Sequence, residues 1–449
     1  MGKITDKSPK SCRYPGPAAL VQHNRRVRPD ESRLAALACE LIGFQPVGGT
    51  PGEAAIQRHL AELARQARSD DGPSWQVHTW DIPVAEVTAR ADFPGMEVER
   101  THATGVIVRL PGTGGGRTLL IDGHTDVVPP GDRDAWSQDP FTPVRTRVDG
   151  RPALVGRGAC DMLGGLAAAW EALRMVTESG IALRGDVVLA PVSAEEDGGL
   201  GTYALLDEMR ASGIHPDACI VPEPTDLDLV PANGGALTFR LIVPGAAVHA
   251  SRRSEGVSAI ENLWPIHTAL VELERVRNRD VDPLMSRWPI AYPISLGTVT
   301  AGDWASTVPD RLIANGRYGV ALGEDTASAR AQLEDAVARA CASDPWLREH
   351  PATVEWWGGQ FASGRTDPGS EIVELLAETS TRHTGRAPEV YAAPYGSDLR
   401  LLTGIGQIPT VQYGPGDTAY AHAPDEHVAI QDLVTCASVL ADVIVEYCR

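Results

Sequence analysis

The sequence repeats one arrangement four times: a short apolar run followed by a polar cluster rich in acids or histidine. The runs are residues 119–121, 187–189, 219–221 and 410–411, and the polar residues that follow them include His124, Asp126, Glu195, Glu196, Glu223 and His422. A short apolar run bounded by turn residues is typical of a buried strand. The carboxyl ends of such strands meet at one edge of an open α/β sheet, where ligands bind. The pattern therefore predicts a sheet that gathers these side chains at one edge.

The character of the chain changes near residue 233. Before it, apolar runs alternate with helical segments such as residues 162–179, which indicates a mostly parallel sheet covered by helices on both faces. After it, the order strand–helix–strand–strand–helix–strand indicates a separate α+β unit with a ferredoxin-like arrangement. The predicted parts are a flexible lead-in of residues 1–28, an α/β domain of residues 29–232 and 358–449, and an inserted α+β domain of residues 233–357.

Charge and cysteine content narrow the class of protein. The 449 residues include 59 acidic and 40 basic side chains, which gives a formal charge of −19 at pH 7. This charge disfavours nucleic acid and anionic membranes as partners, but it does not identify the small-molecule substrate that we expect. The seven cysteines are scattered without a CxxC pair, which argues against thiolate zinc sites and disulfide frameworks. The sequence shows no signal peptide and no apolar stretch of membrane-spanning length. We expect a cytoplasmic protein.

The polar clusters combine histidine with carboxylates, a donor set that suits zinc, cobalt or manganese. Two such ions about 3.5–4 Å apart polarise a carbonyl and activate water near neutral pH. A pair of ions needs a bridging carboxylate and further ligands on each side. Asp161 stands just before a predicted helix, where a carboxylate is favoured, and joins the candidates. The sequence therefore predicts a two-metal hydrolase.

Two short spacings separate ligands from supporting groups. His124 and Asp126 point the same way in an extended segment. One of them can therefore bind a metal while the other orients that ligand from behind. Glu195 and Glu196 are neighbours that point apart, so one can bind metal while the other faces the attacking water as a general base. Each acid alone is more simply a helix cap or a solvated surface residue. Their shared position after strands favours the catalytic interpretation.

The same residues carry a resemblance to a known family. The stretches are GHTDVVP at 123–129, GRGACDM at 156–162, SAEEDGGLGT at 193–202 and PEP at 222–224, followed by the late His422. They resemble the M20 metallopeptidase family, which includes acetylornithine deacetylase, succinyl-diaminopimelate desuccinylase, aminoacylase-1 and glutamate carboxypeptidase. The resemblance covers nearly the whole chain. It implies an aminopeptidase-like catalytic domain whose inserted unit serves as a lid and as the contact of a homodimer.

The resemblance also implies which residues hold the metals. His124 and Glu223 would bind one ion, and Glu196 and His422 the other. Asp161 would bridge the two ions, of which zinc is the first expectation and cobalt or manganese the alternatives. One departure is Leu163, where many relatives have lysine, a residue that is not a metal ligand.

Further roles follow from the resemblance. Asp126 would support His124, and Glu195 would be the general base. His249 resembles a histidine of the inserted domain that reaches the partner's active site in dimeric members and stabilises the oxyanion. Residues 236–243 are expected to form an exposed sheet edge that pairs in the dimer. Three residues are expected to bind substrate: Arg317, Gly396 and Ser397.

The expected reaction is removal of a small acyl group from an amine by hydrolysis of a linear amide bond. The contexts around Trp304 and residues 394–398 are most similar to acetylornithine deacetylase-like members and related deformylases. A dipeptidase or carboxypeptidase with the same site is the first alternative. A tailoring amidohydrolase or amide-forming enzyme of secondary metabolism is another. A non-enzymatic binding protein is disfavoured because Glu195 and all five ligands are intact.

Overall fold

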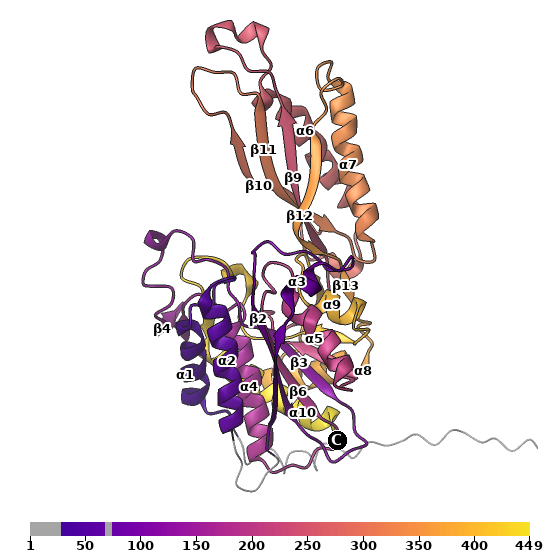
Figure 1. The fold of residues 1–449 in the computed structure, drawn as a ribbon. Coiled ribbons are helices and arrows are strands. Elements are labelled where there is room, and N and C mark those ends of the chain that lie inside the picture. Colours follow the sequence, from indigo (N-terminus) through magenta and orange to yellow (C-terminus); the bar gives the residue numbers. More distant parts are fainter. Residues whose placement is uncertain (1–27, 68–73) are drawn as a thin grey trace, which may run out of the picture.

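The computed structural model describes residues 28–67 and 74–449. The predicted lead-in of residues 1–28 lies outside the described residues except for Arg28. The described chain forms two units (Figure 1). One is a helix-covered sheet built from both ends of the sequence, and the other is a second sheet, built from its middle, that projects away from the first. Within these ranges no helix combines the length and the apolar character needed to cross a bilayer.

The larger unit is organised around a sheet of nine described strands. They are β1 (Gln76–Ile82), β2 (Ala103–Leu110), β3 (Leu119–His124), β6 (Val187–Val192), β7 (Ala218–Val221), β8 (Leu229–Asn233), β13 (Gly364–Arg365), β14 (Val390–Ala393) and β15 (Thr410–Gln412). Their order is β1-β2-β6-β3-β7-β15-β8-β13, and β14 pairs with β8. The central strands β6, β3, β7 and β15 are parallel, whereas β1 and β2 are antiparallel additions. The predicted mostly parallel sheet is confirmed at its centre.

Helices cover both faces of this sheet because successive strand residues point to opposite sides. In β3, Leu119 and Ile121 enter one apolar core and Leu120 enters the other. The first core is closed by α1 (Glu31–Gly43), α2 (Pro51–Gln66), α4 (Leu163–Glu178), α8 (Glu371–Thr384) and α10 (Ile430–Tyr447). The second is closed by α3 (Val84–Thr88), α5 (Leu200–Ala211) and α9 (Leu399–Gly404).

A small sheet brings two distant loops together. It consists of β4 (Val144–Val148), β5 (Arg151–Val155) and β16 (His427–Ala429) in the order β16-β5-β4. His427 pairs with Val155. The segment that leaves β5 toward Asp161 therefore starts beside the segment that comes from His422. Short 3-10 turns, η1 (Arg133–Ala135) and η4 (Thr418–Tyr420), lie in the connecting loops.

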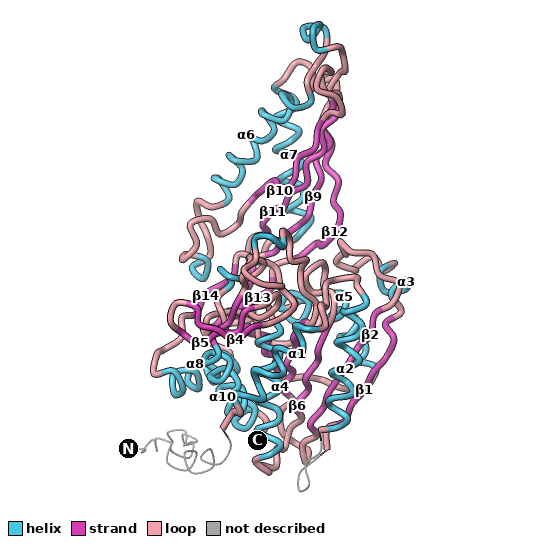
Figure 2. The backbone as a smooth tube through the Cα atoms, turned by 90° about the vertical axis from the view of Figure 1, so that its left-hand side faces the viewer, coloured by secondary structure: helices cyan, strands magenta, loops and turns pink. Residues whose placement is uncertain are grey.

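The inserted unit is a four-stranded antiparallel sheet with both of its helices on one face (Figure 2). Its elements are β9 (Gly235–Pro244), η2 (Ala250–Glu255), α6 (Ala259–Arg277), η3 (Pro283–Met285), β10 (Ile294–Ala301), β11 (Arg311–Val320), α7 (Thr326–Ser343) and β12 (Thr353–Phe361). Phe239, Ile266 and Leu333 join strand and helices in one apolar core. The sequential order β-α-β-β-α-β is the ferredoxin-like arrangement that the sequence predicts.

One expectation about this sheet is wrong. Residues 236–243 belong to β9, which is a central strand between β11 and β12 and not an edge. Alternating apolar and polar residues indicate that one face of a strand is covered, but they do not indicate whether its edges are paired. The edge strands are β10 and β12. Every residue of β10 is at least partly exposed.

Candidate active site

The carboxyl ends of three neighbouring parallel strands carry the histidine and acidic clusters. His124 is the last residue of β3, Glu195 and Glu196 follow β6, and Glu223 follows β7. Because the strands pair in the order β6-β3-β7, the three clusters lie side by side. The apolar runs that precede them are buried on both faces, so the first polar residues stand where the strands leave the core.

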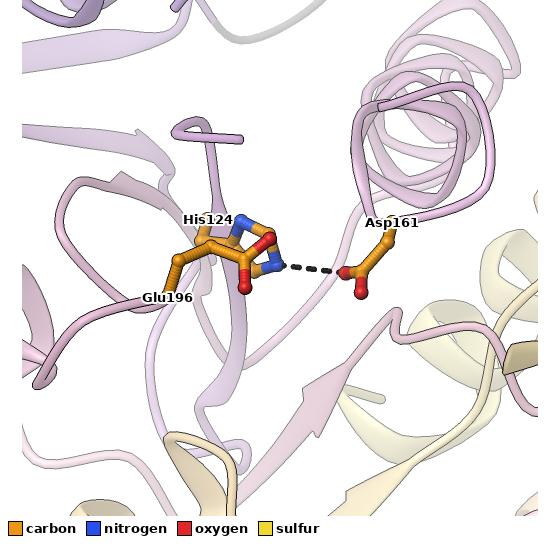
Figure 3. A group of neighbouring side chains, drawn as sticks. All are labelled: His124, Asp161 and Glu196. Carbon is orange, nitrogen blue, oxygen red and sulfur yellow. Dashed lines mark hydrogen bonds and ion pairs between the residues drawn. The ribbon is translucent and has the colours of Figure 1, made fainter. Parts of the chain in front are cut away.

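Asp161 and His422 reach the same edge from two loops. Asp161 precedes α4, whose N-cap residue is Met162 and has no side-chain capping bond. The Asp161 carboxylate is therefore not used as a helix cap and turns toward His124 (Figure 3). His422 follows η4 and has a φ of 61°, a left-handed backbone conformation that is uncommon for residues other than glycine. The pairing of β16 with β5 holds the two loops next to each other.

The Asp161 carboxylate lies between two imidazoles. Its Oδ1 is 3.1 Å from His124 Nε2, and its Oδ2 is 3.4 Å from His422 Nε2. His422 Nε2 is also 3.1 Å from Glu196 Oε2. Ligand atoms of one tetrahedral ion with bonds of about 2.0–2.1 Å lie roughly 3.3 Å apart. The spacing of these groups fits that of atoms that share metal ions.

The protonation of His124 also fits a cation. Its Nδ1–H donates to the backbone carbonyl of Asp126 at 2.9 Å, and a carbonyl only accepts, so this bond places the proton on Nδ1. In the neutral imidazole Nε2 then turns a lone pair toward the Asp161 oxygen. Two lone pairs at this distance repel each other unless a proton or a metal ion lies between them. A divalent ion satisfies both groups.

The pKa shifts of the clustered histidines and acids reflect an excess of negative charge around them. Burial lowers the pKa of His124, but hydrogen bonding to Asp161 and the charge of Glu223 outweigh it and raise that pKa well above its usual value. The same competition, with Asp161 and Glu196 as the acids, raises the pKa of His422 to about 11. Burial raises the pKa of Glu223, and the charge of Asp161 adds to the effect. Cations are therefore favoured at this point.

Asp126 supports the site differently from the expectation. Its carboxylate Oδ1 lies 3.9 Å from His124 Nδ1, so the closer contact to the imidazole comes from its own backbone carbonyl. The two carboxylate oxygens accept the backbone N–H groups of Glu195 and Glu196, at 3.2 Å each. Burial raises the pKa of Asp126 to about 7. This residue ties the end of β3 to the loop that follows β6.

A buried ion pair that sequence reasoning missed connects the other two loops. Glu426 Oε1 accepts the backbone N–H groups of Cys160 and Asp161 at 2.9 and 3.0 Å. Its Oε2 accepts from Arg157 Nη1 at 2.5 Å, and Arg157 Nη2 donates to the carbonyl of His422 at 3.3 Å. The only signals in the sequence were a charged residue inside the motif GRGACDM and a glutamate four residues after His422.

A cavity of about 550 Å³ opens beside these groups. One wall is acidic and belongs to the larger unit, and the other wall includes residues of β11 and β12 of the inserted unit. The lining residues include Glu97, Asp161, Glu195, Glu196, Glu223, Arg317, Phe361, Tyr395, Gly396 and His422. This volume suits a small molecule.

The structure places the predicted substrate-binding residues differently. Arg317 and Gly396 line the cavity, but Ser397 does not. Ser397 is buried, and its hydroxyl lies 3.4 Å from Asn233 Oδ1 and 3.1 Å from Gln412 Nε2. The sequence around Gly396 and Ser397 indicates that this loop lies near the site, but it does not indicate where the Ser397 side chain points.

His249 is not part of the cavity formed by its own chain. It directly precedes η2, its side chain is exposed, and Nδ1 lies 2.8 Å from the hydroxyl of Ser251. In Figure 1 this segment lies at the end of the inserted unit that is remote from the larger unit. The described chain alone does not bring His249 to Glu195.

The fold and the site define a class: a metallohydrolase with an inserted α+β unit. Residues 120–446 match the peptidase family M20/M25/M40. The match covers more than half of the chain and includes every candidate ligand, so the chain belongs to this family.

Relatives and solved structures agree with this membership. An N-formyl-4-amino-5-aminomethyl-2-methylpyrimidine deformylase of Bacillus subtilis is 28% identical over 94% of this chain and 96% of its own length. A succinyl-diaminopimelate desuccinylase of Gluconacetobacter diazotrophicus is 33% identical over 73% of this chain and 80% of its own. The Saccharomyces cerevisiae di-peptidase Dug1p is similar with a TM-score of 0.72, 14% identity and coverage of 93% and 96%. Bacillus subtilis YXEP, a dinuclear metal binding peptidase, has a TM-score of 0.57, 17% identity and coverage of 93% and 99%. The two structures show a shared fold.

Proposed function

We propose that this protein is a two-metal amidohydrolase that removes a small acyl group from an amine, in the manner of acetylornithine deacetylase and related deformylases. One observation carries the proposal: the two oxygens of Asp161 face His124 and His422 at 3.1 and 3.4 Å. A carboxylate that faces one ligand on each side is arranged to bridge two ions.

The remaining ligands divide between the two ions by distance. Glu223 Oε1 is 4.0 Å from His124 Nε2, whereas Glu196 Oε2 is 3.1 Å from His422 Nε2. His124 and Glu223 would therefore hold one ion and His422 and Glu196 the other, with Asp161 shared. Two bound ions, zinc first and cobalt or manganese as alternatives, would polarise the amide carbonyl and activate water near neutral pH.

Glu195 is proposed as the general base. It lines the cavity next to the cluster of His124, Asp161 and Glu196 but is not part of that cluster. Burial raises the pKa of Glu195, and the charge of Asp398 adds to the effect. A base works best when its pKa is near the operating pH. Glu195 would take a proton from the attacking water and return it to the nitrogen of the leaving amine.

Two curated relatives support acyl removal. The names deformylase and desuccinylase both describe removal of an acyl group, and this chain covers 96% and 80% of those two proteins. A dipeptidase or carboxypeptidase is the second candidate. It is favoured by Arg317, a cation in the cavity that is able to hold a terminal carboxylate.

We also propose a homodimer formed through the inserted unit. The edge strands of its sheet are β10 and β12 rather than β9, and two-fold pairing of an edge would protect it. In such a dimer His249 would reach the partner's cavity and hold negative charge that develops on the amide oxygen. The exposed position of His249 outside its own cavity supports this proposal.

The test is a substrate screen of the zinc-loaded protein against N-formyl, N-acetyl and N-succinyl amines and against dipeptides. We expect the highest kcat/KM for an N-acyl amine, loss of activity with a chelator and recovery on adding zinc. A higher kcat/KM for dipeptides would favour the second candidate. Failure of the metal-loaded protein to hydrolyse any amide would overturn the proposal.

A further inference from the structure

One acidic residue of the cavity, Glu97, is neither a proposed metal ligand nor the proposed general base. Glu97 comes from the loop between α3 and β2 and faces the cation of the inserted unit, with Arg317 Nη2 3.7 Å from Glu97 Oε1. Both side chains line the cavity and are partly exposed, at 30% for Glu97 and 46% for Arg317. The cation expected to bind a substrate carboxylate therefore already has a carboxylate beside it.

Glu97 is held in place from the larger unit. Its backbone N–H donates to the carbonyl of Asp197 at 3.1 Å. The Asp197 carboxylate accepts the next backbone N–H, of Val98, at 2.7 Å and pairs with Arg100 at 2.8 Å. Arg100 and Asp197 are both buried. Since Asp197 directly follows the Glu195–Glu196 pair, the loop of Glu97 is fixed to the catalytic loop.

The inserted unit also makes room for Glu97. Gly358 in β12 has a φ of +63°, and a Cβ there would lie 2.5 Å from Glu97 Cγ. The strand is irregular at this point, since its register with β9 shifts between Trp356 and Gln360. Thr238 of β9 donates its hydroxyl to Glu97 Oε1 at 2.8 Å. Among the described residues, no other hydrogen bond reaches the Glu97 carboxylate, so Oε2 is able to accept one from a ligand.

We propose that Glu97 selects substrates that present an amino-type hydrogen-bond donor, and selects against substrates that present a carboxylate to Arg317. This inference rests on the proposed amidohydrolase function. A substrate carboxylate at Arg317 would lie beside Glu97 and would be repelled by it. An ammonium or amino group at the same place would donate to Glu97 Oε2 in a charge-assisted bond. The favoured substrate is therefore an N-acylated diamine or another amide whose amine half carries a second N–H group.

The test compares two substrates that share an acyl group and a short linker. N-acylethylenediamine ends in an ammonium, and N-acyl-β-alanine ends in a carboxylate. We expect wild type to have the higher kcat/KM for the diamine. Glu97→Gln should lower kcat/KM for the diamine by about 10- to 100-fold, mainly through KM, because it removes a charged hydrogen bond. The same change should raise kcat/KM for the β-alanine substrate.

Glu99→Gln is the matched control. Glu99 lies in the same loop and carries the same charge, but it lines a different cavity. The control should leave the preference unchanged, and metal content should stay equal in all three proteins. A wild-type preference for the carboxylate, or equal effects of the two variants, would overturn the inference while the amidohydrolase proposal stands. If no N-acyl amine is hydrolysed at all, the proposed function fails and this inference fails with it.

Discussion

The two walls of the cavity are built differently. The wall with the proposed metal ligands consists of strand ends and of loops joined to each other by buried hydrogen bonds. His124 is 2% and Glu223 5% exposed, and His422 at the rim of this wall has a side chain that is 51% exposed. The opposite wall contains Arg317, whose side chain is 46% exposed, and belongs partly to the inserted unit. Side chains locked by packing and several bonds hold a fixed geometry. We therefore propose that the reaction chemistry lies in the fixed wall and that substrate choice is made where Arg317 of the opposite wall faces Glu97.

Among the variants of the fixed wall, Asp161→Ala is expected to have the largest effect on metal binding and activity. A bridging carboxylate offsets the charge of two cations that otherwise repel each other in a site of reduced dielectric. We expect the variant to keep at most one weakly held ion and to lose all measurable activity. Elemental analysis after gel filtration measures the metal, and circular dichroism checks folding. Two tightly bound ions in a folded variant would show that Asp161 is not the bridge.

Glu195→Gln, in the same wall, should lower activity without lowering the metal content. We expect activity to fall by about 10²–10⁴-fold, the usual contribution of a general base, while two ions per chain remain bound. The measurements are kcat and metal content on one preparation. If metal is lost together with activity, the roles of Glu195 and Glu196 are exchanged.

Glu426→Gln tests whether the buried pair with Arg157 stabilises the fixed wall. We expect metal binding to weaken by about 10–100-fold, as for other residues that support ligands from behind. The reason is that Glu426 holds the backbone of Asp161 and, through Arg157, the carbonyl of His422. Competition with a zinc-binding dye measures the affinity.

Glu324→Gln is the control for that variant. Glu324 pairs at 2.6 Å with Arg277, whose side chain is 6% exposed, and accepts the backbone N–H of Ala321 at 2.8 Å, but it lies in the inserted unit. Both variants should lose stability, on the order of 1–3 kcal/mol for a hydrogen bond to a charged group. Equal zinc affinities in the two variants would mean that Glu426 only stabilises the fold.

The smallest expected effect is a partial recovery of activity that tests whether His249 of a second subunit completes the exposed wall. Two inactive variants, Glu195→Gln and His249→Ala, are mixed under conditions that exchange subunits. If His249 acts across the interface, each mixed dimer has one intact site, and about a quarter of all sites recover after equal mixing. If it acts within its own chain, every site keeps a lesion and no activity returns. A fully active monomer would exclude the dimer altogether.

The fixed wall is also the region of the structure that the sequence predicts well. Strands buried on both faces require continuous apolar runs, so their ends stand out where polar residues begin. The predicted helix at 162–179 agrees with α4 (Leu163–Glu178) to within one residue at each end. His124, Glu196 and His422 are candidates because they follow such runs, whereas Asp161 is one because it stands just before a predicted helix. The four lie together in the structure.

The remainder depends on contacts that local patterns do not contain. Arg157 and Glu426 are 269 residues apart in sequence and meet only in the folded chain. The inward turn of Ser397, toward Asn233 and Gln412, and the central place of β9 are likewise set by packing between distant segments. Glu97 lies in a loop without apolar periodicity, and its partners come from two other elements.

The junction of the inserted unit has an evolutionary consequence. The chain enters it through β9 and leaves it through β12, and these strands are paired neighbours, with Ala236 opposite Phe361. Because both crossings are adjacent, the unit is a self-contained segment with neighbouring ends, the geometry in which domain insertion is best tolerated. A lineage is then able to exchange or remodel this segment, and acquire a new substrate, without changing the register of the strands that hold His124 and Glu196.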